Sequence, residues 1–567
     1  MSVGRAALTL FLLFLVMATA FQAAAQQAEQ KRYNQLNREL GELYNQGRYQ
    51  EAIPLAKEAF AIVEKALGRR DPNTAKSMHI LATLYSAAGE YGKAEPLYRE
   101  SLSIREEKLG PGHQETAASL NDLALLYKTL GDYARSEPLY QKALALYEKG
   151  FGKDHINTAA VLNNLAELYE ALGDYKKAEP LFTRALSIAE QVLGPDHSNT
   201  ATARHNLAGL YQNMGEYDRA EPLYQKALAV REKTLGPDHP DTAMALGSLA
   251  GLYKQMGEFS KAESFLQRAL RISEKALGPD HNFTAATLGN LAGLYEYMGE
   301  YGKAESLYQQ CLAVFERAVG PSHPDAAVVL GNLAGLHRRL GDYEQAASLY
   351  NKSMVVLEKS LGPKHPTTAN TRSRLAELYG VMGENARAVK LAIRSLEARE
   401  ETLGSNHPDT AGSLHTLAVL YANQGRHDRA EPLLNRALAI REEKLGPSHH
   451  LTAATMSHLA TLYKSRGEFA KAEPLYRKTL SAVVQSLGRQ NPDALASLDN
   501  LALIAGAEGD YEAAHDYHKQ AQEISARLID QIMGFTSEDQ TLRFLASQRE
   551  SLELSLGLAA FHMSGNK

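Results

Sequence analysis

The sequence has one cysteine, no tryptophan and few aromatic residues, which make up 7% of its 567 positions. A single cysteine excludes an internal disulfide bond and a metal site built from several thiolates. The net charge of -5 is small for this length, so the composition indicates neither nucleic-acid binding nor a strongly charged partner. Hydrophobic residues at 44% and charged residues at 22% are ordinary for a soluble globular chain.

The first 25 residues differ from the rest of the chain. Arg5 supplies a positive charge, an apolar run extends over residues 6–20, and small residues follow at Ala23 and Ala25. This pattern predicts a signal peptide at 1–25, cleaved after Ala25 or after Ala20. The run of about 15 apolar residues is shorter than the roughly 20 that span a bilayer. We therefore expect an exported protein without a membrane span, periplasmic or extracellular if the host is bacterial.

One repeat dominates the remaining sequence, and the segment 215–257 is a typical copy. The glycine that opens each copy recurs every 42 residues, at Gly47, Gly89, Gly131, Gly173, Gly215, Gly257, Gly299, Gly341, Gly383, Gly425, Gly467 and Gly509. Twelve copies without an insertion require a regular geometric repeat, because one added residue on a helix would rotate all later side chains by about 100°. The period predicts a solenoid, in which each unit contacts its neighbours.

Each unit contains two helical patterns separated by the turn glycine. Apolar residues at helical spacing predict one helix over 240–256 and a second from Phe259 to the glycine at 278. A proline recurs near the start of the second helix, as at Pro54 and Pro222, and we expect it within the first helical turn, where no hydrogen bond is lost.

A loop of the type GPDHPDTA joins one unit to the next. Its histidines are about one repeat apart and cannot share one metal ion, so we expect loop and capping roles for them. They are His113, His155, His197, His239, His281, His323, His365, His407 and His449.

The helix pair with Leu249, Ala250 and Tyr253, the turn glycine Gly257 and then Phe259 resembles the tetratricopeptide repeat. The usual repeat has 34 residues, and the 42-residue form here, with YxxAEPLYxxAL and LGPDHPDTA, resembles the repeats of kinesin light chains and their bacterial relatives. The resemblance covers roughly residues 30–530. It implies an all-α fold, a right-handed α-solenoid of about twelve antiparallel helix pairs over residues 26–530.

In tetratricopeptide proteins the first helix of each pair lines a concave groove that holds a peptide or a partner helix. The resemblance therefore places a binding surface on the polar residues that precede the Leu-Ala pair of each first helix. These candidates are Asn121, Asn163, Asn164, Asn206, Asn290, Asn332, Arg374, His415, His458 and Asn500. Asparagine is a poor helix former, so its recurrence on one face fits amides offered to a peptide backbone. The alternative is that these amides only link neighbouring helices.

Glycine follows the Leu-Ala pair at Gly209, Gly251, Gly293 and Gly335. Each mid-helix glycine costs about 1 kcal/mol relative to alanine. The sequence therefore predicts that something approaches the helix backbone at these positions, either a ligand or the next helix.

We find no pattern of residues that indicates catalysis, a cofactor or a metal site. Cys311 stands where other units carry alanine, which predicts a buried small residue and not a nucleophile. No phosphate-binding glycine loop and no HExxH motif occurs. We expect a protein that is not an enzyme and that binds a polypeptide.

The segment 531–567 departs from the repeat and predicts a C-terminal capping helix or a connector, its first helix capped by Thr536 or Ser537. It resembles the connector between tetratricopeptide arrays and caspase-like CHAT domains, but no such domain follows in this sequence. Two alternatives to a peptide-binding adaptor stay open: the recognition arm of a CHAT-type protease system, and a scaffold that associates with itself. The sequence leaves the oligomeric state and the partner open.

Overall fold

A computed structural model describes residues 27–487 and 493–533, and all regular secondary structure in these residues is helical. Its 24 helices form twelve consecutive antiparallel pairs, which confirms the predicted α-solenoid. The first helices of the pairs are α2 (Gln27–Asn45), α4 (Pro72–Ala87), α6 (Gln114–Thr129), α8 (Ile156–Ala171), α10 (Ser198–Asn213), α12 (Pro240–Gln255), α14 (Asn282–Tyr297), α16 (Pro324–Arg339), α18 (Pro366–Val381), α20 (Pro408–Asn423), α22 (His450–Ser465) and α24 (Asp493–Glu508). The second helices are α3 (Tyr49–Leu67), α5 (Tyr91–Lys108), α7 (Tyr133–Phe151), α9 (Tyr175–Leu193), α11 (Tyr217–Thr234), α13 (Phe259–Leu277), α15 (Tyr301–Ala318), α17 (Tyr343–Ser360), α19 (Asn385–Leu403), α21 (His427–Lys444), α23 (Phe469–Leu487) and α25 (Tyr511–Met533).

The turn glycine reverses the chain within each pair. At Gly257 the backbone has φ of +79°, a left-handed conformation that favours glycine. The N–H of Glu258 then reaches back to the carbonyl of Tyr253 at 2.8 Å, which closes the end of α12. The second helix begins at the next residue, so the two helices pack side by side with a minimal loop.

The loop histidine begins the first helix of the next pair. In α20 the Nδ1 atom of His407 accepts the N–H of Asp409 at 2.9 Å, and Pro408 occupies the first helical position, where its missing N–H costs nothing. The same capping contact occurs at all nine predicted histidines, so the capping role is confirmed.

The expected place of the second-helix prolines was wrong. Pro54 is the sixth residue of α3, which begins at Tyr49, and it therefore lies beyond the first turn. A proline there cannot donate to the carbonyl of Gln50. Both Pro54 and Gln50 are exposed, so water can reach that carbonyl on the outer face of the solenoid.

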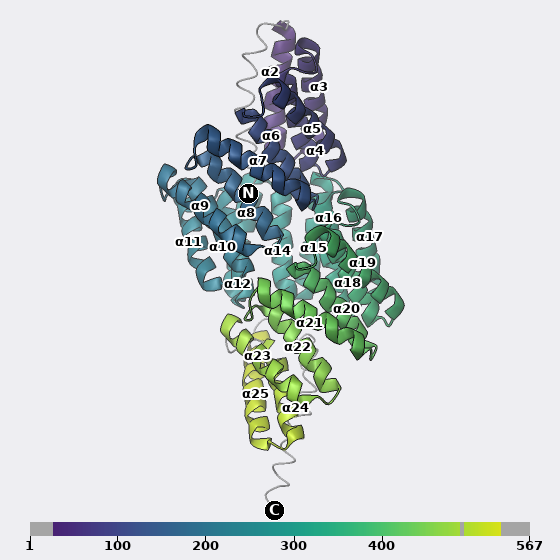
Figure 1. The fold of residues 1–567 in the computed structure, drawn as a ribbon. Coiled ribbons are helices and arrows are strands. Elements are labelled where there is room, and N and C mark those ends of the chain that lie inside the picture. The colour runs from purple at the N-terminus through teal and green to yellow at the C-terminus, as the bar shows by residue number, and fades with distance from the viewer. Residues whose placement is uncertain (1–26, 488–492, 534–567) are drawn as a thin grey trace, which may run out of the picture.

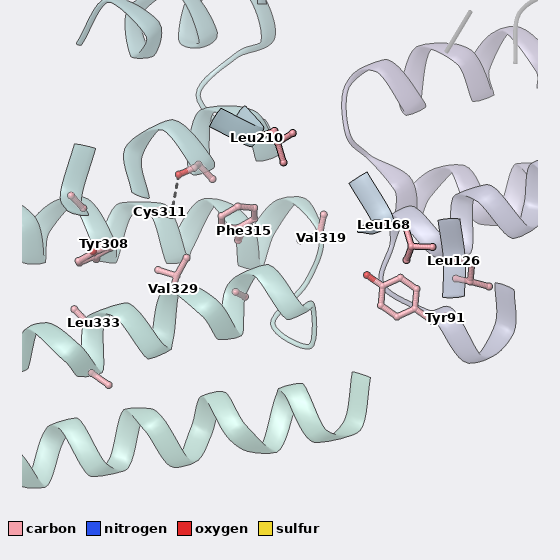
Figure 2. Packing of buried hydrophobic residues seen from close by; sticks show 14 of the residues in the cluster. Tyr91, Leu126, Leu168, Leu210, Tyr308, Cys311, Phe315, Val319, Val329 and Leu333 are labelled. Carbon is pink, nitrogen blue, oxygen red and sulfur yellow. Dashed lines mark hydrogen bonds between the residues drawn. The ribbon is translucent and has the colours of Figure 1, made fainter. Parts of the chain in front are cut away.

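One apolar cluster runs along the solenoid from Tyr33 to Ile504, and Figure 2 shows some of its residues. Cys311 lies in it, fully buried, and its thiol donates to the carbonyl of Ala285 at 3.0 Å. Burial raises the pKa of Cys311 to about 12. A buried thiol that stays protonated is a poor nucleophile, which agrees with the predicted packing role.

The helix pairs wind into a superhelix, with α2 and α3 at one end and α24 and α25 at the other (Figure 1). Its successive turns touch. His365 and His407 each contact a backbone carbonyl 236 residues earlier, in Thr129 and Ala171 respectively. Direct contacts therefore join the successive turns of the superhelix.

Two predicted segments lie outside the described residues. The signal peptide at 1–25 is one of them. In the C-terminal segment, α25 continues to Met533, and the remaining predicted cap or connector, with Thr536 and Ser537, falls beyond it. Among the helices that the structure describes, none is long and apolar enough to cross a membrane.

Candidate binding groove

The first helices of successive pairs line the inner side of the superhelix. They contact one another directly, as α6 does with α8, α12 with α14 and α18 with α20. A helix layer whose successive members touch lies on the side of smaller radius. The predicted residues all belong to these inner helices.

Several predicted side chains are occupied by contacts within the helix stack. Asn164 donates its amide to the Oδ1 atom of Asn121 at 2.8 Å, across neighbouring first helices. Arg374 donates to Asn332 at 3.4 Å. Asn500 accepts from Lys464 at 2.6 Å. These contacts are of the kind that the alternative interpretation expected, amides that link neighbouring helices.

Two predicted asparagines differ from these. Asn290 is exposed and Asn206 is half-buried, and neither amide has a hydrogen-bond partner among the described residues. Asn163, by contrast, is buried, and its Oδ1 atom is unbonded there. Because an unbonded amide on an accessible helix face can pair with a peptide backbone, Asn206 and Asn290 are the best placed of the candidates.

The two predicted histidines form a pair. The rings of His415 and His458 lie 4.5 Å apart, edge to face, and His458 also bonds the carbonyl of Ala454. Burial, and then the neighbouring His458, lowers the pKa of His415 to about 3. The part of the chain that the structure describes holds no group of three or more metal-ligating side chains. The pair is a ring contact between α20 and α22.

A cavity of about 190 Å³ opens where α8 and α10 meet. Its lining residues are Glu167, Glu170, Phe182, His205, Asn206, Gly209 and Tyr224. Asn206 is the only one of them among the predicted binding residues. Gly209 was predicted as a point of close approach to the helix backbone. The remaining lining residues were not predicted, because no single unit of the sequence shows which residues of two units meet.

Glu170 gives this cavity its electrostatic character. Burial, and to a smaller extent the neighbouring carboxylate of Glu167, raises the pKa of Glu170 to about 7. Asn213 opposes the shift by donating to Glu170 at 2.6 Å. Glu167 is paired with Lys128 at 2.7 Å. Around neutral pH the carboxyl of Glu170 therefore exists in both protonation states.

His205 forms part of the wall of the cavity. It is 8% exposed, lies 5.1 Å from the ring of Tyr224, and contacts Ser248 at 3.2 Å. Burial, and then the charge of Arg231, lowers the pKa of His205 to about 3. The wall is thus uncharged, and Glu170 and Glu167 are the acidic groups of the cavity.

Three of the four mid-helix glycines, Gly209, Gly293 and Gly335, lie beside a tyrosine hydroxyl of the same helix pair. A Cβ atom added at Gly293 would lie 3.4 Å from the hydroxyl of Tyr308, and one at Gly335 would lie 3.5 Å from the hydroxyl of Tyr350. In a unit that carries threonine in place of this glycine, such as Thr83, the threonine hydroxyl forms a hydrogen bond with the hydroxyl of Tyr98 at 2.9 Å. The sequence predicted a ligand or the next helix beside these glycines, and the structure shows the next helix there.

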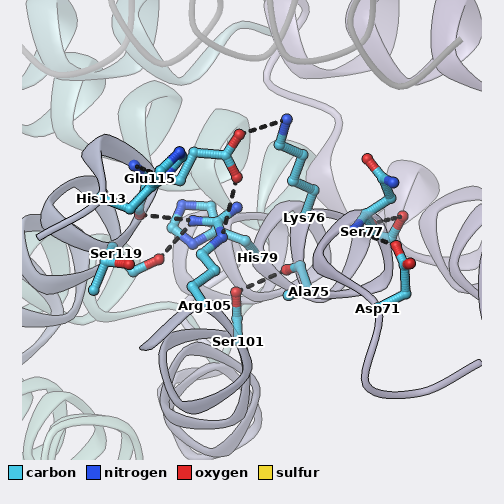
Figure 3. Close-up of polar contacts among 12 residues, drawn as sticks. Asp71, Ala75, Lys76, Ser77, His79, Ser101, Arg105, His113, Glu115 and Ser119 are labelled. Atoms are coloured by element: carbon cyan, nitrogen blue, oxygen red, sulfur yellow. Dashed lines mark hydrogen bonds and ion pairs between the residues drawn. The ribbon is translucent and has the colours of Figure 1, made fainter. Parts of the chain in front are cut away.

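Buried arginines join one helix pair to the next, and the sequence analysis did not single them out. Figure 3 shows Arg105 of α5 donating to Ser119 of α6, with Glu115 3.6 Å from its guanidinium. The same figure shows Lys76 paired with Glu115 at 2.7 Å. In the same register, Arg399 and Arg441 donate to Ser413 and Thr455 of the next pair, whereas Arg231 contacts His205 and Thr202 of its own pair. These arginines recur in the sequence shortly before the LG or GP of the loop, and that recurrence could have identified them.

The fold defines a class of protein, the α-solenoids built from antiparallel helix pairs. Within that class, this chain belongs to the tetratricopeptide repeat family. That family matches overlapping segments that run from residue 33 to residue 527, among them 33–107, 199–275 and 451–527. Proteins with these repeats bind protein partners.

Among solved structures, the chain is similar to a putative kinesin light chain of Podosopora anserina with nearly identical TPR-like repeats, at 27% identity over 36% of this chain and 97% of that one, with a TM-score of 0.31. It is similar to BtubC (BKLC) of P. vanneervenii at 26% identity, over 45% and 94% of the two chains, with a TM-score of 0.33. A Rap protein complexed with competence and sporulation factor is 14% identical over 74% and 99%, with a TM-score of 0.42. No curated protein matches the chain.

Proposed function

We propose that this protein is a non-catalytic adaptor that binds an extended polypeptide or a partner helix in its concave groove. One observation carries the proposal: the amides of Asn206 and Asn290 have no hydrogen-bond partner among the described residues, whereas Asn164 and Asn332 are engaged within the stack. An amide both donates and accepts, so it can pair with the N–H and C=O of a peptide bond.

The cavity beside Asn206 supports the same function. Residues of α8 and α10 line it, and the uncharged side chains of Phe182, His205 and Tyr224 share its lining with Glu170. A volume of about 190 Å³ suits one large side chain of a bound segment. The polypeptide would then be fixed by backbone contacts at Asn206 and Asn290 and by one side chain in this cavity.

The test is capture of partners from the compartment in which the protein resides, followed by measurement of the affinity for the partner identified. The double variant Asn206→Ala with Asn290→Ala should bind that partner about tenfold more weakly, because each lost hydrogen bond contributes about 0.5–1.5 kcal/mol. The matched control, Asn164→Ala with Asn332→Ala, removes two amides that are engaged within the stack and should bind as the unaltered protein does.

Helicity measured by circular dichroism must be the same in both variants. Equal affinity in the groove variant and the unaltered protein would place the binding surface elsewhere and overturn the proposal. A partner lost only in the control variant would show that the stack contacts, and not the open amides, shape the site.

We also propose that the protein is exported, on the strength of Arg5, the apolar run 6–20 and the small residues Ala23 and Ala25. The N-terminus of the protein purified from its own cell should then be Gln26 or Phe21 by mass spectrometry. An N-terminus at Met1 in a protein that fractionates with the cytoplasm would contradict this.

A further inference from the structure

The turn glycines have different surroundings at the two ends of the superhelix. In the first turn, Gly47, Gly131 and Gly173 are buried, although each lies in a loop. The equivalent glycines of the last pairs are exposed, with nothing among the described residues within 4 Å of an added Cβ atom: Gly341, Gly383, Gly425 and Gly467. Identical turns are therefore covered at one end and open at the other.

The loop histidines show the reverse pattern. His113 and His197 of the first superhelical turn are exposed, and His155 and His239 are half-buried. In the second turn four of the five equivalent histidines are covered, with exposed fractions of 6–8% at His281, His323, His407 and His449, and His365 is half-buried. A loop that is open at one end of the molecule is thus buried further along the chain.

The two patterns have one cause, the contact between superhelical turns. The Nε2 atom of His407 donates to the carbonyl of Ala171, and a Cβ atom added at Gly173 would lie 2.6 Å from the Cδ atom of Pro408. The same packing occurs between Gly131 and Pro366, at 2.9 Å, and between Gly89 and the ring of His323. The histidine loop fits closely over a turn that only glycine can provide.

Among the described residues, each end of the molecule therefore presents one half of this contact without the other half. We name the loops at His113, His155, His197 and His239 the histidine edge. The turns at Gly341, Gly383, Gly425 and Gly467 form the glycine edge. Within one molecule the two kinds of surface already pair five times, at His281, His323, His365, His407 and His449.

We propose that the histidine edge of one copy docks on the glycine edge of a second copy, so that the superhelix continues from molecule to molecule. The contact joins two different surfaces and is head-to-tail, and such contacts form an open filament when rotation does not close them into a ring. The occupant is a second copy because the interface that it would form continues one that the chain already makes with itself. This proposal is independent of the ligand in the concave groove.

Two single substitutions block one edge each. Val381, at the glycine edge, is 55% exposed and corresponds in register to Ala171, so Val381→Glu adds a bulky charge where a loop must pack. Ser198 follows His197 at the histidine edge, and Ser198→Glu is compatible with the first turn of α10, where an acidic residue is favourable. Val355, 67% exposed on α17, lies on neither edge, and Val355→Glu is the control.

The measurement is sedimentation velocity of the full chain over a wide range of concentration. The unaltered protein and Val355→Glu should form species that grow with concentration, and each edge variant should weaken association by about tenfold or more, or about 1.4 kcal/mol. An equal mixture of the two edge variants should form dimers and nothing larger, since only one functional edge of each kind remains. If Val381→Glu lowers the helicity of the protein, Asn423→Glu is used in its place.

Other results would overturn the proposal. A protein that stays monomeric at all concentrations would do so, as would edge variants that associate like the unaltered protein. Association that appears only when residues 534–567 are removed would show that this chain's own C-terminal segment occupies the glycine edge. Dimers formed by each edge variant alone would indicate a symmetric contact of a different kind.

Discussion

His407 donates its Nε2–H to the backbone carbonyl of Ala171 at 2.9 Å, while its Nδ1 atom accepts the N–H of Asp409 at 2.9 Å. Both contacts are made by the neutral ring with its proton on Nε2. One side chain therefore begins a helix and also joins two turns of the superhelix. The shape of the groove depends on these contacts, because they fix the spacing between turns.

Replacing a turn glycine should cost more in the first superhelical turn than in the last. Gly173→Ala places a Cβ atom 2.6 Å from the ring of Pro408, whereas Gly425→Ala meets nothing among the described residues within 4 Å. Both substitutions cost about 1–2 kcal/mol for a left-handed backbone. Overpacking should add about 1–3 kcal/mol at Gly173 alone. Denaturant unfolding of the two variants measures the difference, and equal destabilisation would contradict contact between turns.

Acid should loosen the contacts between superhelical turns. Burial lowers the pKa of His281, His323, His365 and His407, and lowers that of His449 to about 3. A group whose pKa is lowered in the folded state stabilises it fully above the unfolded value of about 6.5, and that contribution is lost as the pH falls toward the folded value. We therefore expect the superhelix to lengthen in small-angle X-ray scattering as the pH falls from about 7 to about 5.

A variant with asparagine at these five histidines tests the cause. Asparagine caps helices well but cannot reach the carbonyl of the neighbouring turn. The variant should be extended already at neutral pH and should change little with acid. Asparagine at His113, His155 and His197 is the control and should leave the dimensions unchanged. An unaltered protein of constant length across this pH range would refute the prediction.

Glu170→Gln should stabilise the protein at alkaline pH. Burial raises the pKa of Glu170 to about 7, so its contribution to stability is present below the unfolded pKa and is lost as the pH rises through 7. The substitution removes the buried charge and should raise the free energy of unfolding by about 2–3 kcal/mol at pH 8 and by little at pH 5. Unfolding curves at both values measure this. A gain of the same size at both would mean that the charge of Glu170 is not the cause.

The sequence predicted much of the fold, because the 42-residue period repeats local signals. The predicted bounds of the helices at Pro240 and Phe259 agree with α12 and α13, and the histidine caps follow from a loop motif. The contact between turns could not be predicted. It depends on a small rotation between units, summed over 236 residues, and the same loop motif is exposed at His197 and buried at His407.

The candidate site was predicted only in outline. The concave face followed from the family resemblance, but which amides are open depends on contacts between units, as between Asn164 and Asn121. The cavity at Glu170 also combines residues of two units. A pattern within one repeat does not contain that information.

Gly335→Ala should stabilise α16. An added Cβ atom would lie 3.5 Å from the hydroxyl of Tyr350, which is ordinary contact, and alanine is favoured over glycine in a helix by about 1 kcal/mol. Gly380→Ala is the comparison, since its Cβ atom would lie 2.5 Å from the Cδ2 atom of Leu420 and that side chain must move. In thermal unfolding, the melting temperature of Gly335→Ala should be higher than that of the unaltered protein and that of Gly380→Ala. A loss of stability in Gly335→Ala would show that the space beside this glycine is needed.

The central claim is that a polypeptide lies along the concave face, and site-specific photo-crosslinking tests it most directly. A photoreactive residue at Asn290, on the inner face of α14, should form a covalent adduct with the bound partner. The same residue at Val355, exposed on the second-layer helix α17, should not. Adducts at Val355 and none at Asn290 would place the partner on the outer face and contradict the account.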